Sequence, residues 1–403
     1  MYIYHTHCRA CGYAQSGAQG AKLVQSEKLI EVFDLGVQPL ANDFRRPGEE
    51  MSGYAPLKVM FCPRCTLAQL SVVVKPETLY RNYSYVTSPS RMMQEHFEHL
   101  IADITAETGR TDVLEISSND GLLLAMMKSK GFLVLGVDPA ENLSEAARIN
   151  GIPTQTGFFG EDLSRILPKS DIVIARHVFC HVDDWKDFIR GLDAVSHDDT
   201  LICIEVPYVG DTLQNCQFDQ IYHEHISFMS IGAMLALLKD TRFYLHKIVR
   251  YAIHGGAIML MLRVGHGGVI GWDEKITLQD WEKFAVEAHN QIDRLKATIQ
   301  TLRSQGKRVA ALGASAKSTV WISACGFTRK SIEFIADSTP QKQLTFSPGT
   351  DIPIVDEGAI LRELPDYVVM FAWNFRDEIL EKFSLARSKG VKFIIPVPRI
   401  EIA

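Results

Sequence analysis

Residues 113–121 have the sequence VLEISSNDG, in which a short run of strand character is followed by a turn of small polar residues. The run at 113–116 predicts a strand, and the small residues after it predict a sharp turn into a helix. Further strands are predicted at 133–138, 171–175 and 201–206, with helical patterns between them. Such alternation is typical of a doubly wound parallel sheet, so the sequence predicts an α/β fold.

The length and composition of the chain limit what it can be. Its 403 residues predict two or three domains of about 150 residues each. With 46% hydrophobic and 22% charged residues it falls in the ordinary globular range, which excludes disorder and low-complexity scaffolds. Lys and Arg number 42 against 48 Asp and Glu, a formal charge of −6, and no basic run is present, so no nucleic-acid partner is expected.

The sequence also bears on where the protein resides. The N-terminal residues MYIYH lack the charged-then-apolar pattern of a signal peptide. No uninterrupted apolar run reaches the roughly 18 residues that would span a bilayer. We therefore expect a cytoplasmic protein without a membrane partner.

Three segments follow from changes in composition along the chain. Residues 1–80 hold two C-x-x-C pairs among Pro and Gly and predict a small, loop-rich module, and residues 81–245 hold the first alternation of strands and helices. Residues 246–403 begin as a Gly-punctuated β-rich linker, continue as a long helix and end in a second alternation, with strands predicted at 308–313, 332–337, 367–371 and 391–396. The last segment therefore predicts a second Rossmann-like domain.

The long helix is predicted at 278–302, where apolar residues recur at steps of three and four. Thr277 precedes this periodic run as an N-cap, and Gly306 ends it. We expect a connecting helix packed between the two α/β units; the alternative is a long coiled coil.

The two C-x-x-C pairs, Cys8 with Cys11 and Cys62 with Cys65, can supply four thiolates to one tetrahedral zinc ion. The other cysteines are scattered singly, which is not typical of the disulfide framework of a secreted domain. A small loop-rich segment has little core and gains folding free energy from a metal. We therefore expect a structural zinc ion with no open coordination position; the alternative is two redox or merely structural thiol pairs.

The turn at 117–121 follows one strand, and Asp138 ends the next. An acid at that place can accept both ribose hydroxyls of an adenosine, which suits adenosine cofactors in general. The glycine triplet of a dinucleotide fingerprint is missing, because Ser117 and Asn119 stand where tight turns favour glycine and only Gly121 remains. This disfavours NAD, whose pyrophosphate needs close approach of the backbone, whereas S-adenosylmethionine has no phosphate and tolerates such a turn. The alternative is an ordinary strand-to-helix turn.

Polar residues that suit acid–base chemistry follow the next two predicted strands. Arg176, His177 and His181 come after the third strand, where loops form the ligand crevice of such sheets. Beyond the fourth strand, residues 222–225 read YHEH. A neutral histidine can remove a proton next to a carbonyl while a neighbouring Tyr or Glu orients it. Metal binding by the two histidines of this sequence, or simple capping of backbone groups, are the alternatives.

In the last segment, residues 313–319 read GASAKST after a predicted strand and open a helix, and Asp337 stands at the tip of the next strand. This is not a Walker A motif, because Ala316 stands where that motif needs glycine before the lysine. Small residues at a helix N-terminus together with Lys317 can still hold a diphosphate. The alternative is a packing turn of small residues.

In this order, the motifs resemble those of the S-adenosylmethionine-dependent C-methyltransferases that act on nucleotide-linked deoxy-keto sugars. The resemblance covers essentially the whole chain and is carried by the four paired cysteines, by EISSNDG (115–121) and YHEH (222–225), and by GASAK (313–317), PGT (348–350) and WNF (373–375). It implies transfer of a methyl group to a ring carbon next to a ketone, with carbon 3 of a 4-keto-6-deoxyhexose on thymidine diphosphate as the expected acceptor. The partner would be this small-molecule nucleotide sugar.

The resemblance also implies roles for individual residues. His225 is expected as the base, with Tyr222 and Glu224 beside it and His181 near the sugar. The residues expected to hold the cofactor are Glu115, Ser117, Asn119, Gly121, Asp138, Pro139, Phe158, Arg176, His177 and Tyr83, the last together with Tyr80 and Tyr85 as aromatic cover. The residues expected to hold the nucleotide diphosphate are Gly313, Ser315, Lys317 and Asp337.

Two other functions stay open at this point. One is methylation of an oxygen or nitrogen on another small acceptor, which needs no carbon-acid base. The other is a nucleotide-binding module that has lost catalysis, against which the intact YHEH sequence argues. The choice of sugar, of carbon 3 or carbon 5, and of the histidine that acts as base also stays open, and for the oligomeric state a monomer is expected.

Overall fold

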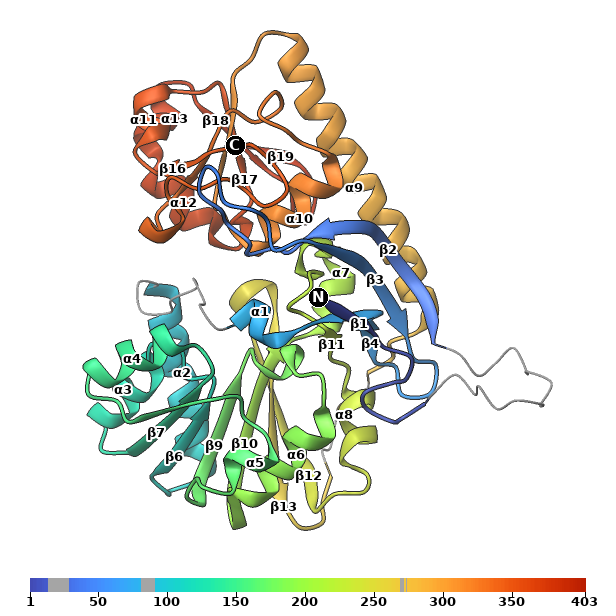
Figure 1. The fold of residues 1–403 in the computed structure, drawn as a ribbon, viewed down its shortest axis with the longest axis vertical. Coiled ribbons are helices and arrows are strands. Elements are labelled where there is room, and N and C mark those ends of the chain that lie inside the picture. Colours follow the sequence, from blue (N-terminus) through green and yellow to red (C-terminus); the bar gives the residue numbers. More distant parts are fainter. Residues whose placement is uncertain (14–28, 81–90, 269–271, 273) are drawn as a thin grey trace, which may run out of the picture.

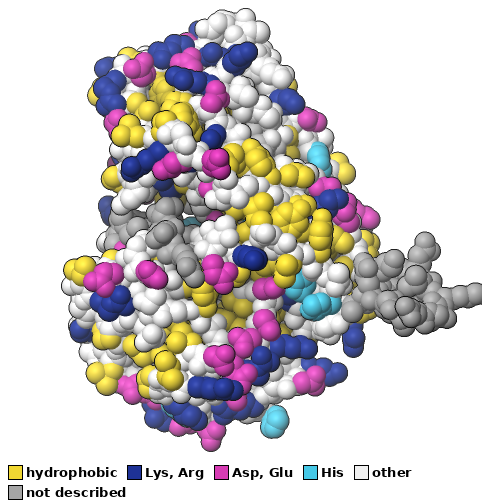
Figure 2. Space-filling model, viewed as in Figure 1, with side chains coloured by type: hydrophobic (Ala, Val, Ile, Leu, Met, Phe, Trp, Pro, Cys, Tyr) yellow, Lys and Arg dark blue, Asp and Glu magenta, His cyan; other side chains and the backbone are white. Residues whose placement is uncertain are grey.

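The computed structural model describes residues 1–13, 29–80, 91–268, 272 and 274–403. Within these residues lie four β-sheets, and helices flank the two larger ones (Figure 1). Among the described helices, none combines the length and apolar character that a membrane crossing requires. Both signs of charge are interspersed on the face shown in Figure 2.

The central sheet has seven strands in the order β12-β13-β10-β9-β6-β7-β8. Its strands are β6 Asp112–Ile116, β7 Leu133–Asp138, β8 Thr154–Thr156, β9 Ser170–Arg176, β10 Ser196–Pro207, β12 Phe243–Tyr251 and β13 Ala257–Val264. Its helices are α2 Arg91–Glu107, α3 Leu122–Ser129, α4 Glu141–Ile149, α5 Glu161–Ser164, α6 Trp185–Ala194, α7 Val209–Gln214 and α8 Ile231–Leu238. Strands β6 to β10 pair in parallel, so the predicted doubly wound α/β sheet is confirmed.

Strands β12 and β13 of this sheet come largely from the stretch that the sequence predicts as a linker. The sequence assigns residues from 246 onward to a β-rich linker, but in the structure they form most of β12 and all of β13. Strand β13 pairs antiparallel with both β10 and β12. Residues 257–262 of β13 are completely buried, and a strand that is apolar on both faces favours the interior of a sheet. The stretch therefore belongs to the central sheet rather than to a linker.

The strand order creates a crevice at one edge of the central sheet. From β6 the chain winds outward through β7 and β8 on one side, while β9 and β10 continue on the other. At such a switch point the loops beyond the carboxyl ends of the two middle strands part and leave room for a ligand. The loops that begin at Ser117 and His177 border this crevice.

The C-terminal sheet repeats this plan with six strands in the order β16-β15-β14-β17-β18-β19. Its strands are β14 Val309–Leu312, β15 Ile335–Asp337, β16 Ile354–Asp356, β17 Tyr367–Met370, β18 Lys392–Ile395 and β19 Glu401–Ile402, and its helices are α10 Ala316–Cys325, α11 Ala359–Glu363, α12 Arg376–Lys382 and α13 Ser384–Ser388. All but β19 pair in parallel, and the four predicted strands are confirmed. The switch point lies between β14 and β17, so the loops that begin at Gly313 and Phe371 border a second crevice.

The N-terminal segment forms two smaller sheets. Strands β2 Ile30–Pro39, β3 Tyr54–Phe61 and β4 Ala68–Leu70 form one sheet with β11 Ser227–Phe228, while β1 Tyr2–Tyr4 pairs with β5 Val72–Val74, and α1 Pro76–Tyr80 follows. Strand β11 begins one residue beyond the YHEH sequence, after Ile226, and pairs antiparallel with β4. One buried core includes Leu57, Ile204 and Val309, which come from the three predicted segments. The three segments therefore share a core.

Helix α9, Leu278–Ser304, runs along one side of the molecule, next to the C-terminal sheet and on past β2 (Figure 1). Thr277 accepts a hydrogen bond from the backbone N–H of Asp280, and the Asp280 side chain bonds back in a capping box. After the C-cap Gln305, Gly306 has a φ of 75°. Both predicted ends are confirmed. The helix packs against β2, α7, α10 and β14 of the same chain, so it is the connecting helix and not a coiled coil.

Candidate active site

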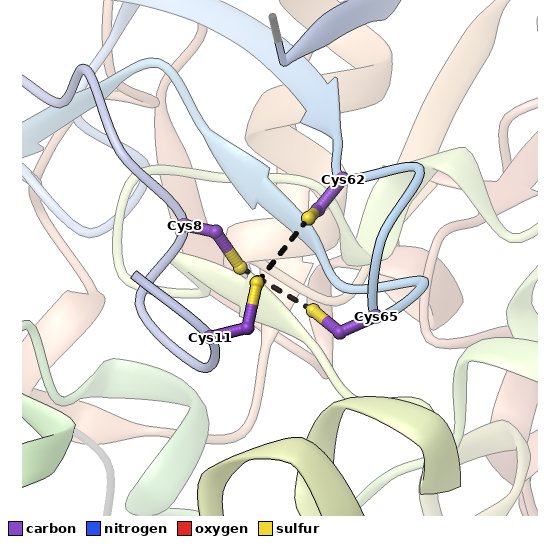
Figure 3. A group of neighbouring side chains, drawn as sticks. All are labelled: Cys8, Cys11, Cys62 and Cys65. Atoms are coloured by element: carbon purple, nitrogen blue, oxygen red, sulfur yellow. Dashed lines mark hydrogen bonds between the residues drawn. The ribbon is translucent and has the colours of Figure 1, made fainter. Parts of the chain in front are cut away.

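The four cysteines of the two C-x-x-C pairs converge in space (Figure 3). The sulfur atoms of Cys8 and Cys65 lie 3.4 Å apart, and those of Cys11 and Cys62 lie 3.7 Å apart. Four sulfurs bound to zinc at about 2.3 Å stand about 3.8 Å apart in tetrahedral geometry, so the cluster fits this ion. Four thiolates fill the coordination sphere, so such a site holds the fold and has no position for a substrate.

A cavity of about 600 Å³ is lined by the loops of both switch points and by the N-terminal segment. The residues expected to hold the cofactor that line it are Ser117, Asn119, Asp138, Pro139, Phe158, Arg176 and His177. The residues expected for catalysis and for the diphosphate that line it are His181, Tyr222, His225, Ser315 and Lys317. Those that do not line it are Glu115, Gly121, Glu224, Gly313 and Asp337, while Tyr83 and Tyr85 lie outside the described residues.

The turn after β6 adopts a conformation that usually favours glycine. Ser117, Asn119 and Gly121 have φ values of 57°, 55° and 82°; asparagine tolerates this left-handed region better than most residues. The Asp138 carboxylate fixes the turn, because it accepts from the backbone N–H of Asn119 and of Ala140, each at 2.8 Å. Burial raises the pKa of Asp138 to about 6, although these N–H groups oppose the shift. The turn opens into the cavity without a glycine triplet, which fits a cofactor that has no phosphate.

Glu115 and Arg176 form a buried ion pair beneath the cavity. Nε and Nη2 of Arg176 donate to Oε1 of Glu115 at 3.1 and 3.0 Å, and the guanidinium carbon lies 4.1 Å from the centre of the Phe97 ring. Burial raises the pKa of Glu115 to about 7, and the charge of Arg176 opposes that shift. Glu115 thus positions Arg176, which lines the cavity. Gly121 likewise acts indirectly, as the N-cap residue of α3.

His225 is held in one tautomer by its surroundings. Its Nδ1 lies 2.8 Å from the backbone oxygen of Gln220, and because a carbonyl oxygen only accepts, Nδ1 carries the proton. Nε2 therefore accepts a hydrogen bond from the Tyr222 hydroxyl, at 2.6 Å. Burial lowers the pKa of His225 well below its ordinary value, and the neighbouring His181 lowers it further. The result is a neutral imidazole whose basic nitrogen is paired with a phenol.

His181 lies beside His225, with ring centres 5.2 Å apart. It ends the short 3-10 helix Phe179–His181 after β9, and its Nδ1 lies 3.0 Å from the hydroxyl oxygen of Tyr80 in α1. Burial lowers the pKa of His181 to about 3 and raises the pKa of Tyr80 well above its ordinary value. Both side chains are therefore uncharged at neutral pH.

The two other members of the YHEH sequence attach the N-terminal segment to this loop. Glu224 accepts a hydrogen bond from Nδ2 of Asn42 at 2.6 Å. Nε2 of His223 donates to the backbone oxygen of Ala55 at 3.1 Å. Neither Glu224 nor His223 lines the cavity, so their effect on a bound ligand is indirect.

The sequence leaves open a metal site formed by the two histidines of YHEH, but the structure brings together a different set of possible ligands. Cys180, His181 and His225 offer possible ligand atoms within 4.8 Å of one another, and His223 takes no part. However, both ring nitrogens of His225 are already engaged in hydrogen bonds. Burial also raises the pKa of the Cys180 thiol, which disfavours a thiolate ligand. The arrangement favours acid–base chemistry at His225.

The opposite wall of the cavity carries two lysines, of which Lys342 is buried and Lys317 is half-buried. Lys317, near the start of α10, places its ammonium nitrogen 4.5 Å from the centre of the Trp373 ring. Lys342 donates to the backbone oxygen of Ala314 at 2.7 Å. Burial lowers the pKa of both lysines. Nearby carboxylates oppose this shift for both lysines. Two ammonium groups on one wall nevertheless favour an anionic ligand.

Asp337 fixes a loop of the lysine wall in the way that Asp138 fixes the turn after β6. Its carboxylate accepts from the backbone N–H of Ala314 at 2.6 Å and of Thr339 at 2.8 Å. Gly313 has a φ of 91°, and a Cβ atom at this position would lie 2.8 Å from the Cβ of Ala372. Both residues therefore form the loop that presents Ser315 and Lys317 without lining the cavity themselves.

Several residues of the cavity are absent from the expectations drawn from sequence, among them Asn42, His254 and Lys342. Each lies outside any recognised motif and reaches the cavity only through the fold. His254 has a φ of 54°, and its ring centre lies 5.1 Å from that of His177, whose φ is 48°. The pair of glycines directly after His254 is a signal that could have pointed to it.

Comparison with known families agrees with this geometry. A methyltransferase domain model matches residues 91–248, which contain β6 to β10 and the YHEH sequence. A zinc binding domain model matches residues 22–80, and a C-methyltransferase C-terminal domain model matches residues 273–398. The fold, the cysteine cluster and these matches define a methyltransferase that depends on S-adenosylmethionine and contains a structural zinc site.

The chain also matches a named relative over nearly its whole length. It is 30% identical to the C-methyltransferase NovU of Streptomyces niveus over 97% of this chain and 95% of that protein. The protein therefore belongs to the C-methyltransferase family. Similar solved structures include magnesium protoporphyrin IX methyltransferase of Synechocystis PCC 6803 with bound SAH (17% identity, 43% of this chain, 83% of that chain, TM-score 0.35). Another is PH0226 protein of Pyrococcus horikoshii OT3 (13% identity, 45% of this chain, 95% of that chain, TM-score 0.36).

Proposed function

We propose that this C-methyltransferase methylates the ring carbon next to the ketone of a nucleotide-linked 4-keto-6-deoxysugar, at carbon 3, with His225 as the base. The observation that carries the proposal is the hydrogen bond between Tyr222 and Nε2 of His225 in the cavity. A carbon nucleophile requires a base that removes a proton from a carbon acid, whereas methylation of an oxygen or nitrogen does not.

The proton step uses the tautomer that the fold imposes. Nε2 of His225 receives the proton from the sugar carbon, either directly or through the Tyr222 hydroxyl, which gives its own proton to Nε2 as it takes one from the sugar. The Gln220 carbonyl remains bonded to Nδ1 and stabilises the imidazolium that forms. The electron pair left on the sugar is shared with the ketone oxygen as an enolate. When bound, S-adenosylmethionine supplies the electrophilic methyl group.

The enolate oxygen needs a hydrogen-bond donor while it carries negative charge. His181 lines the cavity beside His225. It is neutral, so one of its ring nitrogens carries a proton that it can donate. We assign the contact with the ketone oxygen to His181, with Tyr80 fixing its ring through the bond to Nδ1.

The two lysines of the cavity wall support a diphosphate as the carrier of the sugar. Lys317 and Lys342 line the cavity, and Ser315 is the N-cap of α10 there. Free backbone N–H groups and the helix dipole at that end favour an anion as well. The cofactor is assigned to the other wall, at the turn after β6 and at Asp138.

Replacement of His225 tests the proposal. His225→Asn should bind S-adenosylmethionine as the unaltered protein does, because the turn after β6 is untouched, but turnover should fall by about a hundredfold or more. Turnover is measured with labelled cofactor and a panel of thymidine-diphosphate keto-deoxysugars, and the labelled carbon is identified in each product. Cofactor affinity is measured by calorimetry.

Solvent deuterium exchange separates carbon methylation from the alternatives. The unaltered protein should catalyse exchange of the proton at the reacting carbon, and His225→Asn should not. His223→Asn is the matched control, because this histidine belongs to the same loop but does not line the cavity, and it should retain exchange. Unchanged turnover in His225→Asn, or a product methylated on oxygen or nitrogen, would overturn the proposal.

A further inference from the structure

Arg9 stands inside the first C-x-x-C pair, between Cys8 and Cys11, and is only 4% exposed. Its Nε donates to Oδ1 of Asp183 at 3.1 Å, and its Nη1 donates to the backbone oxygen of Ile226 at 3.4 Å. The planar guanidinium offers several donors in fixed directions. One side chain from the cysteine cluster therefore contacts two separate loops of the methyltransferase segment.

Both contacts lie next to the proposed catalytic histidines. Asp183 follows His181 by two residues, and Ile226 directly follows His225. The two loops are also bonded to each other, because the backbone N–H of Ile226 donates to the backbone oxygen of Cys180 at 2.9 Å. Because Arg9 contacts both loops, its position helps to set the distance between the rings of His181 and His225, whose centres are 5.2 Å apart.

Arg9 is itself fixed by the N-terminal segment. Its backbone N–H donates to Oε1 of Gln69 at 3.0 Å, and Nε2 of Gln69 donates to the backbone oxygen of His7 at 2.8 Å. Nε2 of His5 lies 2.9 Å from the same Asp183 oxygen that Arg9 contacts. A reacting group is held accurately only when the residues around it are themselves held. The N-terminal segment provides that support for Arg9 through Gln69 and His5.

We propose that Arg9 is a positioning residue for methyl transfer, which fixes the loops of His181 and His225 relative to each other from the zinc-binding cluster. This inference rests on the proposed function of the two histidines. The ion pair with Asp183 connects Arg9 to the loop of His181. The second bond, to the carbonyl of the residue after His225, is what connects Arg9 to the base.

The chain offers a matched control in Arg64. This arginine stands between Cys62 and Cys65 in the second C-x-x-C pair, but it is exposed. Arg64→Met removes the same charge from the same kind of cysteine loop. It should leave zinc content, cofactor affinity and turnover unchanged.

Arg9→Met should behave differently. It should keep its zinc and bind S-adenosylmethionine within about twofold of the unaltered protein, while kcat falls about tenfold to a hundredfold, the scale expected when reacting groups move by about 1 Å. Arg9→Lys keeps the charge but cannot span both acceptors as a fork, so it should recover part of the loss. The His181 and His225 signals in NMR spectra of ¹⁵N-histidine-labelled protein should shift in Arg9→Met and not in Arg64→Met.

A kcat equal to that of the unaltered protein in zinc-loaded Arg9→Met would overturn the inference. Loss of zinc and of cofactor affinity in step with kcat would also overturn it, because Arg9 would then serve folding alone. If the histidine signals shift in Arg9→Met but His225→Asn keeps full turnover, Arg9 does position the two loops. In that case the role of His225 as the base is overturned, and not the role of Arg9. The failure of the inference and the failure of the proposed function are therefore distinguishable.

Discussion

Three histidines that line the cavity have lowered pKa values for a shared reason. Burial is the largest cause for His181, His225 and His254, because it disfavours the charged imidazolium. For His225 the rings of His181 and His177 and the ammonium group of Lys317 add to the effect, since each would repel a second positive charge. A general base must be unprotonated before it acts, so this environment suits the role that we propose for His225.

The pH dependence of turnover should report this environment. The pKa of His225 lies below its ordinary value of 6.5, so the neutral base persists as the pH falls through 6.5 and is lost only at lower pH. We expect kcat to hold its plateau through pH 6.5 and to decline below it. The measurement is kcat with both substrates saturating, from about pH 5 to pH 8.

Tyr222→Phe is the comparison for that profile. The hydroxyl donates to the unprotonated Nε2 and so favours the neutral form. Its removal raises the pKa of His225 and should move the decline of kcat to higher pH. A decline centred above pH 6.5 in the unaltered protein, or no movement in Tyr222→Phe, would contradict the assignment.

Single residues could be predicted from sequence where their chemistry is local. Ser117 and Asn119 follow a predicted strand in place of glycine, and the structure shows the positive φ values that such a turn requires. Lys342 could not be predicted, because its partner Ala314 belongs to another loop. Only the pairing of β14 with β15 brings the two loops together, and no local pattern around Lys342 announces that pairing.

At the scale of elements, strong periodicity was enough to predict that a helix or strand is present, but not which strands pair with each other. The periodic run of α9 and the alternating strands of both larger sheets are present at the expected places. The apolar, glycine-flanked stretch of β13 indicates a strand as well, yet its antiparallel place between β10 and β12 depends on contacts that are distant in sequence. A short apolar run carries no information on which neighbour it will pair with.

The N-terminus of α9 permits a test of how much one N-cap residue contributes to the free energy of unfolding. Thr277 accepts from the backbone N–H of Asp280 at 3.3 Å and completes a capping box. Thr277→Ala should lower the free energy of unfolding by about 1 kcal/mol, because that N–H group loses its partner. The change is measured as a shift in the midpoint of chemical denaturation.

Thr277→Ser controls for the cap itself. Serine keeps the hydroxyl that accepts from Asp280, so most of the stability should be retained. An equal loss in the alanine and serine variants would show that the methyl group of the threonine, and not its hydroxyl, matters at this position.

At the scale of the whole molecule, two switch points are directed at one cavity. Ser117 and His177 come from the central sheet, while Ser315 and Asn374 come from the C-terminal sheet. The histidine pair lies in loops that bond to Asn42 and Tyr80 of the N-terminal segment, through Glu224 and His181. The candidate site therefore depends on all three segments, which explains why no single motif in the sequence could describe it.

The cysteine cluster leads to a prediction about metal content. Purified protein should contain about one zinc ion per chain, bound by four thiolates. Cys62→Ser should lose the ion and lower the free energy of unfolding by about 4 kcal/mol or more, because metal binding and folding are coupled in such sites. Elemental analysis and denaturation curves measure the two effects.

Cys325→Ala is the control for this prediction. This cysteine is also buried, but its sulfur contacts the backbone oxygen of Ile292 at 3.7 Å, away from the cluster. It should keep its zinc. Metal-free unaltered protein with full stability would be incompatible with a structural role for the ion.

Strand β11 gives the molecule an evolutionary constraint. Its residues, Ser227–Phe228, follow the YHEH sequence but complete a sheet whose other strands lie before residue 71. If two related genes recombined at the end of the first segment, strand β4 of one parent would have to pair with strand β11 of the other. Functional hybrids should therefore inherit the cysteine-rich segment and the histidine loop from the same parent, even though more than a hundred intervening residues separate them in the chain.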